Sequence, residues 1–187
     1  MLPSINRPET GEYSPIAQPY IDATAAALFE YGYTDLRQLL TTQCDRLETL
    51  VQGVREEQAN EGYAPGKWSL KESIVHMSDT ERVFAYRAMR VARGDATPLP
   101  GFEQDDYVPE SRSNRRTLPD VLAEFSAVRA ASTALINSLD DDALEKGGTA
   151  SGKPVTVRAL CWMIAGHVAH HLGITRDRYL PALVPSA

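Results

Sequence analysis

Apolar side chains recur at intervals of three and four residues along most of the chain, which is the spacing of one face of an α-helix. Four long stretches show this pattern and predict helices over about 34–58, 69–93, 117–139 and 156–180. A shorter helix is expected over 20–30, and no stretch alternates at period two for long enough to indicate a sheet. Since each long helix has one apolar stripe to bury, we predict an all-α protein built as a four-helix bundle.

Two segments fall outside this pattern. Residues 1–19 contain four prolines and little apolar periodicity, so we expect an irregular N-terminal arm ahead of a single domain over 20–187. The connection 94–117 is long, and loops of this length are usually functional or disordered. Its aromatic residues favour an ordered loop, in which Phe102 and Tyr107 line a substrate pocket. A plain crossover between two helices is the alternative.

Histidines occupy two positions of the last helix where the apolar pattern calls for leucine or isoleucine. The stripe of Val157, Leu160 and Ile164 continues with His167 and His171, so both rings are expected to point into the bundle. Residues four apart lie one turn apart on the same helix face. The two imidazoles are therefore close enough to share a divalent ion.

A third histidine is placed to join them. His76 lies two turns inside the predicted helix 69–93, beside core positions. Three neutral imidazoles in an apolar interior are costly unless their ring nitrogens find a partner, and a metal supplies one. We therefore predict a metal site of His76, His167 and His171, with a coordination position left open as in catalytic sites. Hydrogen-bonded core histidines are the alternative.

The surrounding residues limit the metal chemistry. His170 is turned about 100° from His171 on the helix and is expected at the surface or an interface. No glutamate follows His167 as in the H-E-x-x-H metalloproteases, and no Glu-x-x-His pair indicates a di-iron bundle. Imidazole ligands alone suit Zn²⁺ or Ni²⁺ better than Mg²⁺ or Ca²⁺.

One carboxylate lies where the pattern calls for an apolar side chain. Glu81 falls within the stripe of the helix 69–93, and a buried carboxylate needs a partner. It could accept a hydrogen bond from a metal ligand, act as a catalytic base near the metal, or pair with an arginine such as Arg87 or Arg129.

Composition excludes several classes of protein. The chain has 187 residues, of which 43% are hydrophobic, and 19 basic against 25 acidic side chains give a net charge of −6. Acidity argues against a nucleic-acid partner, because neutralising phosphates dominates that affinity. The first fifteen residues lack the basic and apolar regions of a signal peptide, and no apolar run could span a membrane. We expect a cytoplasmic protein without membrane partners, in which the two cysteines are buried rather than bridged.

Three segments of this sequence resemble the DinB-like (YfiT-type) superfamily of metalloenzymes. They are APGKWSLKESIVH with its continuation over 64–87, RGDATPLPGF over 93–102, and the segment 157–171, which contains AGHVAHH. The resemblance runs from about residue 34 to 181. It implies a four-helix bundle with up-down-down-up connectivity, often dimeric, that holds nickel or zinc through His76, His167 and His171. The acidic residue that follows the first ligand in the family falls on Glu81.

The resemblance also implies a class of reaction. Characterised relatives look like thiol-dependent transferases and isomerases, in which a low-molecular-weight thiol is activated at the metal. A coordinated thiol is deprotonated and becomes nucleophilic at neutral pH, which makes an S-transferase acting on a small electrophile the first expectation. Hydrolysis by a metal-bound hydroxide is an alternative. A non-catalytic, stress-related dimer in which the metal joins two helices is the other hypothesis.

Overall fold

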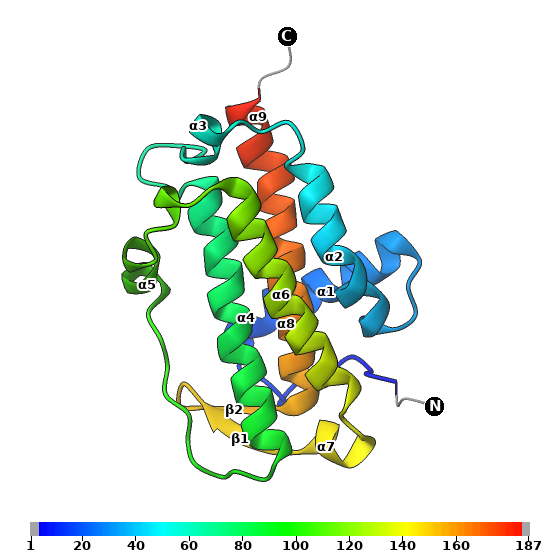
Figure 1. The fold of residues 1–187 in the computed structure, drawn as a ribbon. Helices are drawn as coiled ribbons and strands as arrows, with labels where there is room; N and C mark the ends of the chain where they lie inside the picture. Colours follow the sequence, from blue (N-terminus) through cyan, green and yellow to red (C-terminus); the bar gives the residue numbers. More distant parts are fainter. Residues whose placement is uncertain (1–3, 185–187) are drawn as a thin grey trace.

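The computed structural model describes residues 4–184, and it is built around four long helices. These are α2 (Leu36–Leu50), α4 (Leu70–Ala92), α6 (Leu118–Asn137) and α8 (Val157–Ile174). Helix α4 packs against α6 and α8, and α2 packs against the same two helices. Followed along the chain in Figure 1, the four run up, down, down and up. The predicted four-helix bundle is confirmed, and none of the described helices is long and apolar enough to cross a membrane.

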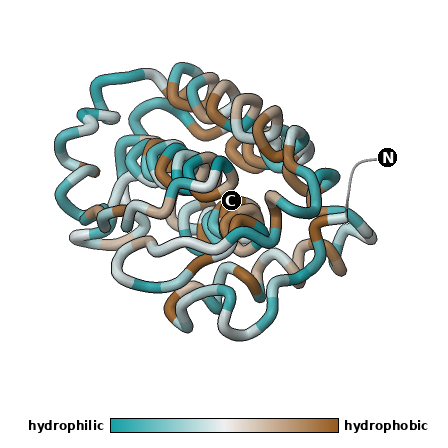
Figure 2. Tube along the Cα trace, turned by 90° about the horizontal axis from the view of Figure 1, so that it is seen from below, coloured by the Kyte–Doolittle hydropathy of each residue, from teal (hydrophilic) through white to brown (hydrophobic). Residues whose placement is uncertain are grey.

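Each long helix buries one side, as its pattern predicts. Hydrophobic and hydrophilic positions alternate along the helices in Figure 2. The start of α4 is fixed by a capping box, in which the Glu72 backbone N–H donates to the Ser69 hydroxyl and the Ser69 N–H donates to the Glu72 carboxylate. This boundary and the predicted start of α6 agree with the structure to within one or two residues.

Other predicted boundaries were wrong. Helix α2 ends at Leu50 rather than near residue 58, because the chain turns through Gly53 at φ +87° before the short α3 (Glu56–Ala59). Helix α8 ends at Ile174 rather than near residue 180. A π-helical turn, Thr175–Tyr179, then leads into α9 (Leu180–Leu183).

The structure also contains a small sheet that the sequence pattern did not predict. Strands β1 (Gly147–Ala150) and β2 (Lys153–Thr156) form an antiparallel hairpin just before α8. Its two turn residues, Ser151 and Gly152, both have positive φ, as in a tight hairpin turn. Four-residue strands are too short for period-two alternation to be visible, so the expectation of no sheet was wrong. A further short helix, α7 (Asp141–Glu145), precedes the hairpin.

The N-terminal segment packs across the start of α8. The Trp162 indole N–H donates to the Ile5 carbonyl over 3.0 Å, and the Glu12 carboxylate accepts from the Arg158 guanidinium over 2.6 Å. A 3₁₀ turn, Pro15–Ala17, follows, and α1 (Gln18–Tyr31) then crosses α8. Helix α1 thus begins earlier than the predicted 20–30. Residues 1–3 of the predicted arm and 185–187 of the predicted domain lie outside the described residues.

Helices α1 and α8 make an unusually close approach at Gly166. A Cβ atom placed on Gly166 would lie 1.8 Å from the Tyr20 carbonyl oxygen, so only glycine allows the backbones to come so near. The Thr24 hydroxyl donates across the same contact to the Trp162 carbonyl over 2.8 Å. This contact places Tyr20 of α1 beside His167 and His170 of α8.

Candidate metal centre

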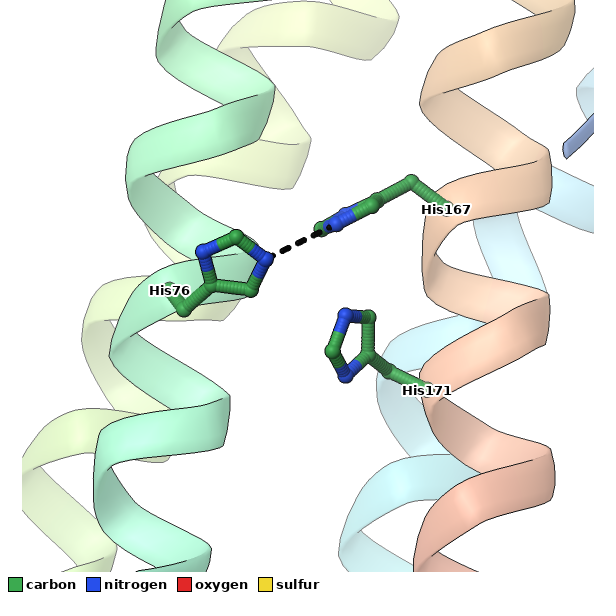
Figure 3. A group of neighbouring side chains, drawn as sticks. All are labelled: His76, His167 and His171. Atoms are coloured by element: carbon green, nitrogen blue, oxygen red, sulfur yellow. Dashed lines mark hydrogen bonds between the residues drawn. The ribbon is translucent and has the colours of Figure 1, made fainter. Parts of the chain in front are cut away.

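Three buried histidines meet between α4 and α8. His76 comes from α4, and His167 and His171 come from α8, one turn apart (Figure 3). Their rings point toward one another across the space between the two helices, and the side chains are 4%, 2% and 8% exposed. The structure therefore brings together the three residues that the helical spacing singled out, while His170 lies at the surface.

The spacing of the ring nitrogens fits a metal ion. One nitrogen from each ring can be chosen so that all three lie within 4.8 Å of one another, and the Nε2 atoms of His76 and His167 are 3.0 Å apart. Zinc–nitrogen bonds of about 2.05 Å in a tetrahedron place ligand nitrogens about 3.3 Å apart. A small adjustment of the side chains would suffice to bind an ion.

Hydroxyl groups orient two of the rings. The Ser73 hydroxyl lies 3.2 Å from Nδ1 of His171, and the Thr80 hydroxyl lies 3.4 Å from Nδ1 of His76. When each Nδ1–H donates to its hydroxyl, Nε2 is left with the lone pair that a metal needs. Both hydroxyls belong to α4, so the helix that supplies one ligand also orients a ligand of α8.

Burial keeps the rings in the ligating form. It lowers the pKa of His76 to about 4 and the pKa of His171 to about 3, and it lowers the pKa of His167 well below its ordinary value. The neighbouring imidazoles lower the pKa values of His167 and His171 further. All three rings are neutral at pH 7, and neutral imidazole is the form that binds metals.

Comparison with known proteins shows the family and the fold of this chain. A sequence model of the DinB superfamily matches residues 38–175, which is most of the chain. The chain belongs to the DinB superfamily. Among solved structures, YfiT from Bacillus subtilis superimposes with a TM-score of 0.70 at 16% sequence identity, over 78% of this chain and 83% of YfiT. YfiT is described as a probable metal-dependent hydrolase with an unusual four-helix bundle topology. No curated protein matches the sequence.

In this DinB-superfamily chain, two cavities reach the histidines from different sides. One, of about 430 Å³, is here called the Phe102 cavity; its lining includes Tyr20, Thr80, Phe84, Arg87, Phe102, Asp105 and His167. The other, of about 500 Å³, is called the Trp68 cavity; its lining includes Tyr63, Trp68, Ser73, Asp105, His171 and Tyr179. Asp105 borders both cavities, and its charge favours the protonated form of His76.

Aromatic rings surround the histidines. The Trp68 ring lies 4.8 Å from the ring of His76, and Tyr20 approaches His167 edge-on at 5.3 Å. Phe84, one of the buried apolar residues of α4, lies 6.2 Å from His167. These rings keep bulk water from much of the site, so a ligand bound there exchanges through the two cavities.

Glu81 lines neither of the two cavities. Its carboxylate pairs with the Arg129 guanidinium over 2.7 Å, both side chains being buried. Arg129 also donates to the Gln43 side-chain oxygen, and Gln43 donates to the Ala165 carbonyl of α8. Of the three roles considered for Glu81, the ion pair is the one that its contacts match. Five residues after His76, Glu81 is turned about 140° around α4, so the two side chains leave different faces of the helix.

The two aromatic residues expected in the pocket differ in position. Phe102 lines its cavity, as expected. Tyr107 belongs to α5 (Gln104–Glu110), is 50% exposed, and contacts the Phe102 ring at 5.7 Å from outside the cavity lining. The connection 94–117 is ordered and carries part of the site, because Asp105 is also on α5.

Sequence reasoning missed three residues at the site: Tyr20, Arg87 and Asp105. Arg87 was considered only as a partner for Glu81, although it lies eleven residues after His76 and hence only about 20° from it around α4. That angle predicts that Arg87 and His76 share one face of α4. Tyr20 and Asp105 arrive through α1 and α5, whose positions depend on contacts far apart in sequence.

Proposed function

We propose that this chain is a divalent-metal-dependent enzyme that joins a small thiol to an electrophilic substrate, with zinc or nickel held by His76, His167 and His171. The observation that carries the proposal is that two cavities end at the same three rings, one at His167 and the other at His171. Two small reactants need two approaches, whereas hydrolysis needs one approach and water. A bound divalent ion lowers the pKa of a coordinating thiol, which then becomes nucleophilic at neutral pH.

The chain's own residues support this chemistry in three ways. Burial keeps the histidine rings neutral, so no proton has to leave before a metal binds. Ser73 and Thr80 hold two of the rings by their Nδ1 atoms. Asp105 borders both cavities and can attract a proton or cation released between them.

Hydrolysis of a small substrate is the second candidate. The description of YfiT as a probable metal-dependent hydrolase favours it. In that reaction one cavity would hold the substrate and the other would admit water.

Metal analysis and a thiol titration test the proposal together. We expect about one zinc or nickel ion per chain in wild type and His170→Ala, and none in His167→Ala. The His170 variant is the matched control, because it removes an exposed imidazole from the same helix. In the Co²⁺-loaded protein, cellular thiols should shift the visible absorption spectrum, and a panel of thiols with small electrophiles should give turnover.

Other outcomes of the metal and thiol tests favour other functions. Metal binding without any thiol-induced shift, together with hydrolysis of small esters or amides, favours the second candidate. Metal binding without either activity favours a non-catalytic protein in which the ion joins α4 to α8. A chain that takes up no metal has hydrogen-bonded core histidines only.

We also propose that the protein is a homodimer, which the family resemblance implies. Light scattering behind size-exclusion chromatography should give twice the chain mass, and a monomer at micromolar concentration would contradict this.

A further inference from the structure

Arg87 is a buried cation without an anionic partner in the chain. Its side chain lines the Phe102 cavity and is 6% exposed. One terminal nitrogen, Nη2, donates to the Pro100 carbonyl over 2.7 Å and to the Ser151 hydroxyl over 3.1 Å. Between residues 4 and 184, no carboxylate lies within ion-pair distance of its guanidinium. A buried charge that lacks a counter-ion is costly, which makes this site unusual.

The unused part of the guanidinium is open to the cavity. Nε and Nη1 carry three of its five N–H groups, and they make no hydrogen bond to residues 4–184. Neither atom is among the solvent-inaccessible side-chain atoms of residues 4–184 that lack a hydrogen-bond partner, so both are accessible to solvent. The Phe102 ring packs at 5.8 Å from the guanidinium carbon and limits its movement. Arg87 lines the cavity, so these unused N–H groups are available there as hydrogen-bond donors.

The charges around the cavity do not neutralise Arg87. Glu103 and Asp105 line the same cavity, yet neither raises the pKa of Arg87, which burial alone lowers. Asp105 acts instead on His76, at the other end. Lys153, from the hairpin, adds a second positive charge to the lining. Arg87 and Lys153 thus bring two positive charges to the lining, and the guanidinium remains protonated at neutral pH.

The distance between Arg87 and the histidines sets the shape of a ligand. Eleven residues separate His76 from Arg87, which corresponds to about 16 Å along α4. Phe84, Leu160 and Met163 line the stretch between them. The cavity volume of about 430 Å³ is within the range for small-molecule sites.

We propose that the Phe102 cavity binds an elongated anionic substrate, with its carboxylate or phosphate on Arg87, its apolar middle along Phe84 and Met163, and its reacting group at the three histidines. The two free N–H groups of Nη1 can donate charge-assisted hydrogen bonds to the oxygens of such an anion. This inference rests on the proposed function only for the statement that the far end of the ligand reacts.

Direct binding tests the inference without any assay of activity. Octanoate and octyl phosphate are titrated into metal-free and zinc-loaded protein by calorimetry, with octanamide as the uncharged probe of the same length. We expect at least one of the two anions to bind both forms of the protein, and the amide to bind at least tenfold more weakly. The stronger anion identifies the headgroup.

Variants of Arg87 locate the binding site. Arg87→Gln should weaken anion binding at least tenfold, and Arg87→Lys, which keeps the charge but not the fork, should have an intermediate effect. Arg93→Gln is the matched control, because Arg93 caps the C-terminus of the same helix, is exposed, and makes no ion pair with residues 4–184. Zinc uptake and far-ultraviolet circular dichroism report whether each variant folds.

Two results would overturn the inference. One is equal binding of the anions and the amide by wild type, which needs no variant. The other is unchanged anion binding by a folded Arg87→Gln protein. Failure of the thiol and ester panels would reject the proposed function, while selective anion binding lost in Arg87→Gln would still support this site.

Discussion

Two ring nitrogens of the three histidines, Nδ1 of His167 and Nε2 of His171, make no hydrogen bond to residues 4–184. Ser73 and Thr80 each serve one Nδ1 atom, and the 3.0 Å contact between the Nε2 atoms of His76 and His167 can share a single proton. An ion would use the remaining lone pairs. Removing one ring should therefore affect metal binding more than it affects the fold.

Replacing His171 by alanine tests this at the ligand set. His171→Ala leaves two ligands, and we expect the zinc affinity to fall by at least about 100-fold. Competition with a chromophoric chelator measures the change. His170→Ala should keep the wild-type affinity, and a His171→Ala protein that retains stoichiometric, tight zinc would contradict the assignment.

The ion pair of Glu81 and Arg129 makes a second residue-level prediction. Glu81→Gln leaves the Arg129 guanidinium buried without its counter-ion, so we expect the free energy of unfolding to fall by about 3 kcal/mol. Urea denaturation measures it. The double variant Glu81→Gln/Arg129→Gln should lose less than the sum of the single losses, since it removes both charges. Unchanged zinc stoichiometry in Glu81→Gln would fit a structural role, and loss of the metal would not.

At the scale of helices and strands, local signals decided which predictions succeeded. The start of α4 could be predicted because Ser69 and Glu72 satisfy each other's backbone groups within four residues. The histidines could be placed because one stripe on α8 faces one stripe on α4. The hairpin could not, since its four-residue strands are too short to show alternation and its contact with Leu99 joins residues far apart in sequence. The same holds for α1, whose position depends on one glycine of α8.

That glycine gives the element-scale prediction. Gly166→Ala should separate α1 from α8 and lower the free energy of unfolding by about 2 kcal/mol, because its Cβ would overlap the Tyr20 carbonyl. Gly173→Ala is the matched control on the same helix, where a Cβ meets nothing within 4 Å. It should be neutral or stabilise the protein by about 0.5 kcal/mol through helix propensity. Urea midpoints compare the two, and equal effects would contradict the close approach.

At the scale of the whole molecule, burying three imidazoles makes folding sensitive to acid. The ordinary histidine pKa is 6.5, while the folded values are about 4 for His76 and about 3 for His171. Below pH 6.5 these histidines bind protons in the unfolded chain, whereas the buried rings of the folded chain stay neutral. The unfolding free energy of the metal-free protein therefore decreases as the pH falls from 6.5 toward 4, and it is highest above 6.5.

Denaturation of chelator-treated protein at several pH values checks this sign. The urea midpoint should drop between pH 6.5 and 5, a window in which few carboxylates titrate. The urea midpoint of His76→Gln should depend less steeply on pH, because this variant has one fewer buried histidine that stays neutral in the folded chain. A midpoint that is flat or rises toward pH 5 would contradict neutral, buried rings.

The directions of α4 and α6 determine how long the connection between them must be. Since α4 and α6 are neighbours that point the same way, the chain must travel back along the bundle between them (Figure 1). Helix α6, with 20 residues, is about 30 Å long, whereas the 25 residues between Ala92 and Leu118 could stretch to about 80 Å. The spare length lets this tether fold over α4, where it places Phe102 against Arg87 and Asp105 at the border of both cavities. His76, His167 and His171 all lie outside this connection, so substitutions in it can reshape the cavity lining without removing a metal-binding ring.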